Sequence, residues 1–169
     1  MAAGPQGRGE HRVILGLRSW GTLVGLVLVL ACSPRGPKDI RYGEELCDYC
    51  HMTITDPAFA AQLVTSTGKV HVFDDVGDLA SFTTEGRVPA DEVYGIWVNL
   101  FLHPAERIPV DDAVFLQSDR LRSPMSSGLA AFRSGVTADS LRGEIGGQIL
   151  MWSDVLRRDR ASRRGADAE

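Results

Sequence analysis

The sequence is poor in the residues on which many small enzymes and secreted scaffolds depend. It contains three cysteines, four histidines and four methionines among 169 residues. Three cysteines are too few to indicate the disulfide framework of many small secreted domains. We find no nucleophile paired with a base, no phosphate-binding loop and no pair of catalytic acids, so the sequence does not predict an enzyme. The net charge of −4 argues against a nucleic-acid partner.

A long apolar run is also missing from the N-terminal segment. Residues 23–30 are almost wholly aliphatic, within an uncharged stretch from 19 to 31. A membrane-spanning helix needs about 20 apolar residues, so this run instead fits the apolar part of a signal peptide. Arg8, Arg12 and Arg18 supply the basic segment that precedes such a run. We predict a signal peptide over residues 1–31.

The leader ends in Leu28-Val29-Leu30-Ala31-Cys32-Ser33, which resembles a bacterial lipobox. In such a motif the cysteine becomes the lipidated first residue, so Cys32 is the predicted lipidation site. We therefore expect a protein of the cell envelope, lipid-anchored to a membrane and facing the periplasm or extracytoplasmic space. An ordinary secretory peptide and an uncleaved anchor are the alternatives, and each of them also exports the domain.

The rest of the chain has the size of one domain. Removing three arginines and one glutamate with the leader leaves 15 basic and 21 acidic residues, a net charge of −6. Residues 32–44 are polar and contain prolines and glycines, which predicts a tether. Residues 157–169 are nearly all charged or small, which predicts a flexible charged tail, with a polybasic membrane contact as the alternative. The expected domain is therefore residues 45–156.

What the sequence does have is a dense group of soft metal ligands. Cys47, Cys50, His51 and Met52 fall within six consecutive positions. Sulfur ligands select copper(I), zinc or iron–sulfur clusters over hard cations. On an extended segment, Cys50 and Met52 would point to the same side and could grip one ion. Cys47 is a further ligand candidate, a disulfide partner of Cys50 or a bystander.

Periodicity predicts short strands with at least one helix. Alternation and turn residues predict strands over 52–55, 59–65, 70–73, 93–99 and 113–117, a helix that begins after Asp74 and Asp75 and ends at Gly86, and a loop over 103–106. The second half weakly echoes the first. Met125 then stands where Met52 stands, and Trp152-Ser153-Asp154-Val155 corresponds to Phe73-Asp74-Asp75-Val76. If the echo is real, the fold consists of two related β-rich units.

The order of these motifs resembles the NosL family, nitrous oxide reductase accessory lipoproteins that act as periplasmic copper(I) chaperones. The resemblance rests on Cys-x-x-Cys-x-Met at residues 47–52, Gly68-Lys69-Val70, residues 73–75, residues 112–115 and the run from Ser123 to Phe132. It implies an α+β fold of two similar small ββαβ-type units, about 45–100 and 110–156, with mainly antiparallel strands and short helices. Two positions depart from the commonest family pattern, because His51 and Ser126 stand where glycine is frequent.

The resemblance also implies a ligand set and a client. Cys50, Met52 and Met125 match the family's metal ligands, with Cys47, His51 and His71 as less certain additions. One thiolate with two neutral thioethers would hold copper(I) and leave an open face for a partner's ligands. The implied partners are nitrous oxide reductase or another copper enzyme, and a membrane copper-handling complex.

Three other functions also fit the Cys-x-x-Cys motif. Cys47, Cys50 and His51 satisfy the attachment pattern of a c-type haem, which would make the protein an electron-transfer lipoprotein. The two cysteines alone could serve a thiol–disulfide redox protein, although the expected thioredoxin-like context is missing. A structural zinc module is the third alternative, but methionine is a poor zinc ligand.

Overall fold

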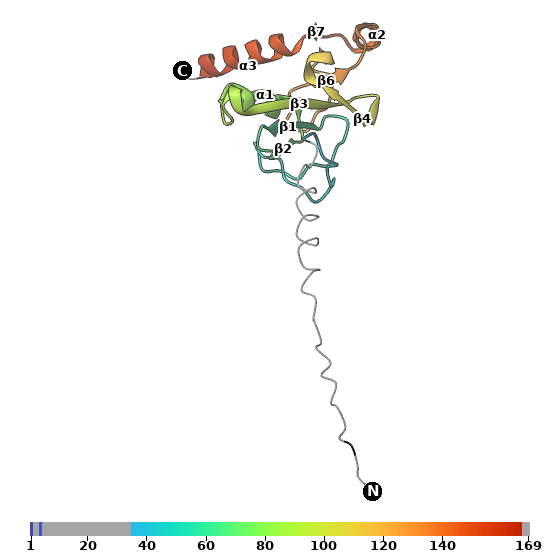
Figure 1. Cartoon of the computed structure of the whole chain (residues 1–169). Coiled ribbons are helices and arrows are strands. Elements are labelled where there is room, and N and C mark those ends of the chain that lie inside the picture. The colour runs from blue at the N-terminus through green and yellow to red at the C-terminus, as the bar shows by residue number, and fades with distance from the viewer. Residues whose placement is uncertain (2–3, 5–34, 167–169) are drawn as a thin grey trace. The chain divides into compact units, whose positions relative to one another are not determined.

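The computed structural model describes Met1, Gly4 and residues 35–166 (Figure 1). The described residues from 35 to 166 belong to one compact unit. The predicted signal peptide and the lipidation site Cys32 lie outside the described residues, apart from Met1 and Gly4. Among the helices that are described, none combines the length and the hydrophobicity needed to cross a membrane.

The first half of the domain is a four-stranded antiparallel sheet with one helix. Its strands lie in the order β2-β1-β3-β4. Gly68, with a φ of +89°, allows the tight turn between the first two strands. The helix begins after the N-cap Asp75, whose side chain accepts a hydrogen bond from the Gly77 amide, and Gly86 follows its C-cap. The elements are β1 (Ala61–Thr65), β2 (Val70–Phe73), α1 (Val76–Thr84), β3 (Val93–Leu100) and β4 (His103–Pro109), with a 3-10 turn η1 (Ala90–Glu92) before β3.

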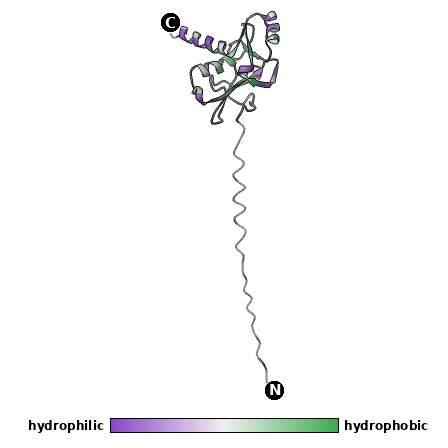
Figure 2. Ribbon diagram, turned by 45° about the horizontal axis from the view of Figure 1, so that its top comes forward, coloured by the Kyte–Doolittle hydropathy of each residue, from purple (hydrophilic) through white to green (hydrophobic). Residues whose placement is uncertain are grey.

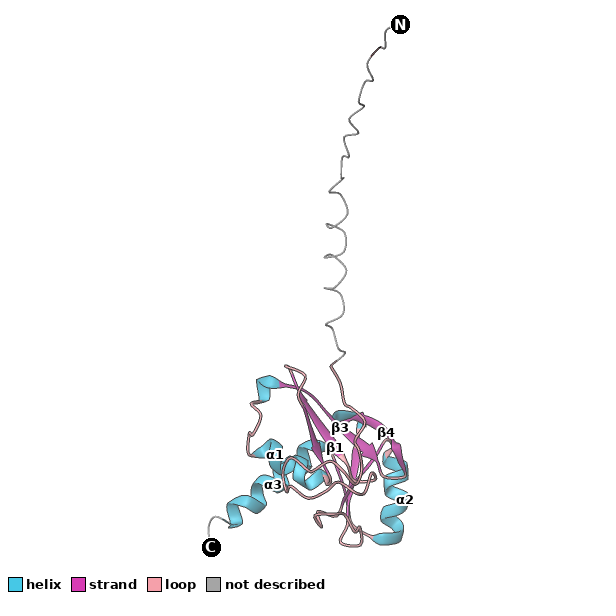
Figure 3. Ribbon diagram, turned by 90° about the horizontal axis from the view of Figure 1, so that it is seen from below, coloured by secondary structure: helices cyan, strands magenta, loops and turns pink. Residues whose placement is uncertain are grey.

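The second half repeats this plan on a smaller scale. Its three strands lie in the order β6-β5-β7, all antiparallel. The elements are η2 (Val110–Asp112), β5 (Val114–Gln117), β6 (Leu129–Phe132), α2 (Gly135–Ile145), β7 (Gln148–Leu150) and a final helix α3 (Trp152–Ala166). In Figure 3 the strands lie between the α1–α3 pair on one side and α2 on the other.

The two halves are related ββαβ units, as the family resemblance implies. The order β2-β1-β3 with α1 corresponds to β6-β5-β7 with α2. The predicted register of the echo is wrong, however. Phe73 precedes α1 as Phe132 precedes α2, so these two correspond, whereas Trp152 starts α3. The false match arose because helix starts attract the same capping residues. Met125 lies between β5 and β6, and Met52 lies before β1, so the two methionines are not equivalent.

One hydrophobic core joins the halves. Phe73 and Phe115 are fully buried in the same cluster, and Phe115 packs against Trp152 of α3 with ring centroids 5.9 Å apart. The Phe101 amide donates to the Ala131 carbonyl at 2.9 Å, which links the end of the first sheet to β6. Each unit alone has only three or four strands, so the shared core explains why the halves fold as one domain.

One predicted loop and one predicted strand are corrected by the structure. Residues 103–106 belong to β4, because the chain turns at Phe101 and Leu102 and pairs back on β3. Pro104 misled the prediction, since proline is tolerated in an edge strand such as this one. Residues 52–55 form no strand, because their pairing is limited to a single bridge between Leu46 and Thr53.

Both predicted flexible ends are shorter than expected. Residues 157–166 continue α3, whose helix pairs basic and acidic side chains four residues apart and packs Val155 into the core. Figure 2 shows that many residues of this C-terminal helix are hydrophilic. The end of the predicted tether is also folded, because Ile40 is buried and the Lys38 backbone exchanges two hydrogen bonds with the Gln62 side chain.

Candidate metal centre

The loop that carries Cys47 and Cys50 is a tight turn. The His51 amide donates to the Cys47 carbonyl at 3.1 Å, and the Cys47 amide donates to the Met52 carbonyl at 2.8 Å. His51 has a φ of +63°. Residues 50–52 are therefore not the extended segment that would place Cys50 and Met52 side by side, and this correction follows from the left-handed residue between them.

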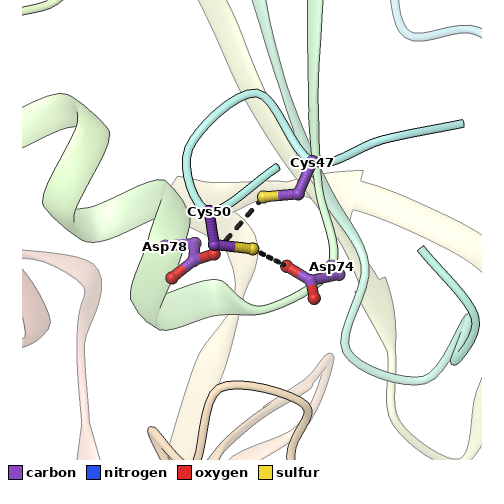
Figure 4. A group of neighbouring side chains, drawn as sticks. All are labelled: Cys47, Cys50, Asp74 and Asp78. Atoms are coloured by element: carbon purple, nitrogen blue, oxygen red, sulfur yellow. Dashed lines mark hydrogen bonds between the residues drawn. The ribbon is translucent and has the colours of Figure 1, made fainter. Parts of the chain in front are cut away.

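The turn brings both thiols to a pair of carboxylates (Figure 4). Cys47 Sγ lies 3.3 Å from Oδ2 of Asp78, and Cys50 Sγ lies 3.5 Å from Oδ1 of Asp74. One potential ligand atom from each of these four residues lies within 4.8 Å of the others. We call Cys47, Cys50, Asp74 and Asp78 the thiol–carboxylate cluster.

The positions of the two carboxylates follow from their places beside the end of β2 and the start of α1. Asp74 follows the end of β2, and Asp78 lies in the first turn of α1, one helical turn further on. Asp75 points elsewhere, because it is the N-cap of α1. We expected a helix to begin after Asp74 and Asp75, and Asp78 was not among the predicted site residues. The available signal was the spacing of four between Asp74 and Asp78, which places two acids on one face where a helix begins.

The cluster holds its protons tightly. Burial raises the pKa of the Cys47 thiol far above its ordinary value. The pKa of Cys50 is raised from 9.0 to about 11, first by burial and then by the neighbouring Asp78 carboxylate. Burial also raises the pKa of Asp78, with repulsion from Asp74 and Asp75 acting in the same direction. At neutral pH both thiols are therefore protonated unless a cation replaces the protons.

The two predicted methionine ligands are exposed. Met52 is 58% exposed and Met125 is 39% exposed. The Met125 amide donates to Oδ2 of Asp75 at 3.0 Å, which fixes its loop beside the start of α1. A cavity of about 330 Å³ is lined by both Met125 and Asp78. The loop from the second unit therefore borders the cluster.

The two histidine candidates lie differently. His51 is exposed on the turn itself. His71 is buried, packs on Phe82 with ring centroids 4.9 Å apart, and has its Nδ1 3.3 Å from Oδ1 of Asp48 without forming a hydrogen bond. His71 is not among the four residues of the cluster.

The donor set is mixed in character. Two thiols and two carboxylates suit a borderline ion such as Zn²⁺, whereas thiolate with thioether favours copper(I). The geometry therefore supports a metal-binding group, and the choice between ions depends on whether a methionine joins the thiols.

Comparisons with known proteins identify the family of this chain. The NosL family model matches residues 39–159. The chain belongs to the NosL family. Among solved structures it is similar to the crystal structure of the copper chaperone NosL from Shewanella denitrificans, with a TM-score of 0.63 and 22% identity, covering 72% of this chain and 96% of that one. At this identity the likeness shows the fold alone. None of the curated proteins matches the chain.

The two departures from the NosL pattern lie at left-handed backbone positions. Among the described residues, the non-glycine residues with positive φ are His51, at +63°, and Ser126, at +60°. The family resemblance implied glycine at both positions, and glycine adopts this conformation without strain. Both turns that border the metal centre thus keep the backbone shape that glycine favours, although this chain has other residues there.

Proposed function

We propose that this protein is an extracytoplasmic, lipid-anchored copper(I) chaperone that delivers its ion to a metalloenzyme. The client that the family resemblance implies is nitrous oxide reductase. The observation that carries the proposal is the thiol–carboxylate cluster, bordered by the Met125 loop, in a chain of the NosL family. Cys50, Met52 and Met125 are the proposed copper ligands. Copper is the cargo of such a protein, and no catalytic step is assigned to it.

The arrangement suits transfer of an ion rather than permanent storage. Cys50 lies at the boundary between the buried cluster and the surface, and the two thioethers are exposed. A partner's ligands can therefore approach the ion from the methionine side while Cys50 still holds it. Protons returning to the thiols would complete the release.

The rival functions fit this geometry less well. A c-type haem needs thioether bonds at both cysteines, but Cys47 is fully buried with its sulfur against Asp78. Catalytic redox cysteines have depressed pKa values, whereas the pKa of Cys50 is raised to about 11. Both cysteines are free thiols in the structure.

Competition with a chromogenic copper(I) chelator tests the ligand assignment. We expect Cys50→Ser and Met52→Ala to weaken copper(I) binding strongly without loss of the fold. Met151→Ala is the matched control, because Met151 is 48% exposed and lies between β7 and α3. Unchanged affinity in both variants would remove the copper assignment. A Soret band in protein from cells that mature cytochromes c would instead favour haem.

The client and the location have separate tests. Deleting the protein should lower the copper content of nitrous oxide reductase in the same cells. Loss of copper from a different enzyme would identify another client. Metabolic labelling with palmitate should mark the wild type and not Cys32→Ser, and labelling of neither would exclude a lipid anchor.

A further inference from the structure

Asp48 ties the cysteine turn to the strand that leads to Asp74. Its amide donates to the Val72 carbonyl at 2.9 Å, and its Oδ2 accepts from the Val72 amide at 2.8 Å. Val72 belongs to β2, which ends one residue before Asp74. The turn is thereby aligned with the first carboxylate of the cluster.

Tyr49 ties the same turn to the helix that carries Asp78. Its hydroxyl donates to Oε1 of Glu85, the C-cap of α1, at 2.8 Å. The Arg87 guanidinium lies over the tyrosine ring, 4.8 Å from its centroid. Each of the two residues between the cysteines therefore holds the turn against an element that supplies a carboxylate.

Arg163, near the end of α3, completes the Tyr49 contact. Its Nη2 donates to the Tyr49 hydroxyl at 2.8 Å, and its Nη1 pairs with Oε1 of Glu85 at 2.5 Å. Its Nε donates to Oδ2 of Asp159 at 2.9 Å, and Asp159 in turn accepts from Ser81 of α1. One planar guanidinium thus joins α3, α1 and the cysteine turn.

We propose that Arg163 and Tyr49 are positioning residues for the metal centre. Together they hold the thiols of the turn against Asp74 and Asp78. This inference rests on the proposed function for its copper readout only. Arg163 lies in α3, beyond residue 159, where the family match ends.

The mechanism is a restraint on local opening of the turn. When the Arg163–Tyr49 contact is lost, the turn keeps its Asp48 bonds, but only the Tyr49–Glu85 hydrogen bond still ties Tyr49 to α1. The turn can then swing away from α1 more often. The thiols then separate from Asp78, and a bound ion loses ligands from one side. Metal release and thiol exposure should both become faster, with little change in global stability.

The test uses the full-length protein with Tyr49→Phe, Arg163→Gln and the double variant. Arg164→Gln is the control, since Arg164 is the exposed neighbour on the same helix. The first readout is the rate of copper(I) transfer to a chelator. The second is alkylation of Cys50 in metal-free protein, followed by peptide mass spectrometry. Tyr49→Phe keeps the ring that packs on Arg87, so it preserves the fold even if Arg163→Gln does not.

We expect each single variant to raise both rates by about 3- to 10-fold, as for loss of one hydrogen bond. The double variant should match Tyr49→Phe, because loss of the Tyr49 hydroxyl already removes its bonds to both Arg163 and Glu85, whereas Arg163→Gln leaves the bond to Glu85. Alkylation should be nearly independent of low denaturant, which marks local opening, whereas a merely stabilising contact would give a steep dependence.

Three results would overturn the proposal: rates within about twofold of the wild type, additive effects in the double variant, or an equal effect of Arg164→Gln. If the wild type takes up no copper(I), the proposed function fails. The alkylation readout still decides the positioning role in that case, because it needs no metal.

Discussion

Replacing Asp78 with asparagine should change thiol reactivity and metal affinity in opposite directions. Asp78 is 5% exposed, and its Oδ2 lies 3.3 Å from Cys47 Sγ. Its charge is one of the causes that raise the pKa of Cys50 to about 11, after burial. Asparagine has nearly the same shape, so Asp78→Asn removes the charge and leaves the packing in place.

The size of the effect follows from the pKa of Cys50. An increase from 9.0 to about 11 lowers the thiolate fraction at neutral pH by about 100-fold. Burial is the larger cause and persists in the variant. The charge of Asp78 therefore accounts for the smaller share, and its removal should speed alkylation of Cys50 by roughly 3- to 10-fold.

The assay is the pH dependence of Cys50 alkylation in metal-free protein, paired with chelator competition for copper(I) or Zn²⁺. If Asp78 is a ligand, Asp78→Asn should alkylate faster and bind the ion at least about tenfold more weakly. Asp139→Asn on the exposed surface of α2 is the control for the substitution itself. A folded variant with unchanged or slower alkylation would refute the electrostatic reasoning, and unchanged affinity would remove Asp78 from the ligand set.

Three further predictions concern protons and backbone shape. Apparent metal affinity should rise about tenfold per pH unit for each thiol proton displaced, and a flat profile in chelator competition would mean that Cys50 is not a ligand. The free energy of unfolding should fall as pH rises from 9.0 to about 11, because the pKa of Cys50 is higher in the folded state than in the unfolded chain. Denaturant titration at several pH values measures this decrease, and Cys50→Ser should make the decrease smaller. Ser126→Gly should stabilise the fold by about 0.5–1 kcal/mol, because glycine adopts the positive φ of Ser126 without strain. The control Ser162→Gly, in the helix α3, should destabilise the fold by a similar amount. Thermal unfolding that shows the same sign for both variants would contradict this prediction.

Local patterns predicted most of the first unit correctly. The alternation around β1 and β2 and the capping role of Asp75 depend on residues close in sequence, so they could be recognised without the fold. The β4 strand and the end of α3 could not. The β4 strand depends on pairing of His103 and residues 107–109 with β3. The end of α3 depends on contacts with α1. Tertiary contacts outweighed local propensity at both places.

The candidate site was predicted only in its sulfur part. Cys47 and Cys50 are close in sequence and rare in composition, so they stand out. Asp74 and Asp78 do not, since aspartate near a helix start has an ordinary capping role. The turn of residues 47–50 packs against β2 and α1 in the structure, and only this packing shows that the Asp74 and Asp78 carboxylates face the thiols.

The contrast between the two halves of the centre bears on how it could work. The thiol–carboxylate cluster is buried and retains its protons, so an ion entering it must displace them, and affinity there depends on pH. The exposed thioethers of Met52 and Met125 carry no protons and bind soft ions over a wide pH range. In the proposed function, an arriving copper(I) ion would be captured at the methionines before the cluster opens, and a departing ion would leave by the same side as the thiols recover their protons. On this reasoning the two repeats are needed together, because Asp78 comes from the first unit and Met125 from the second.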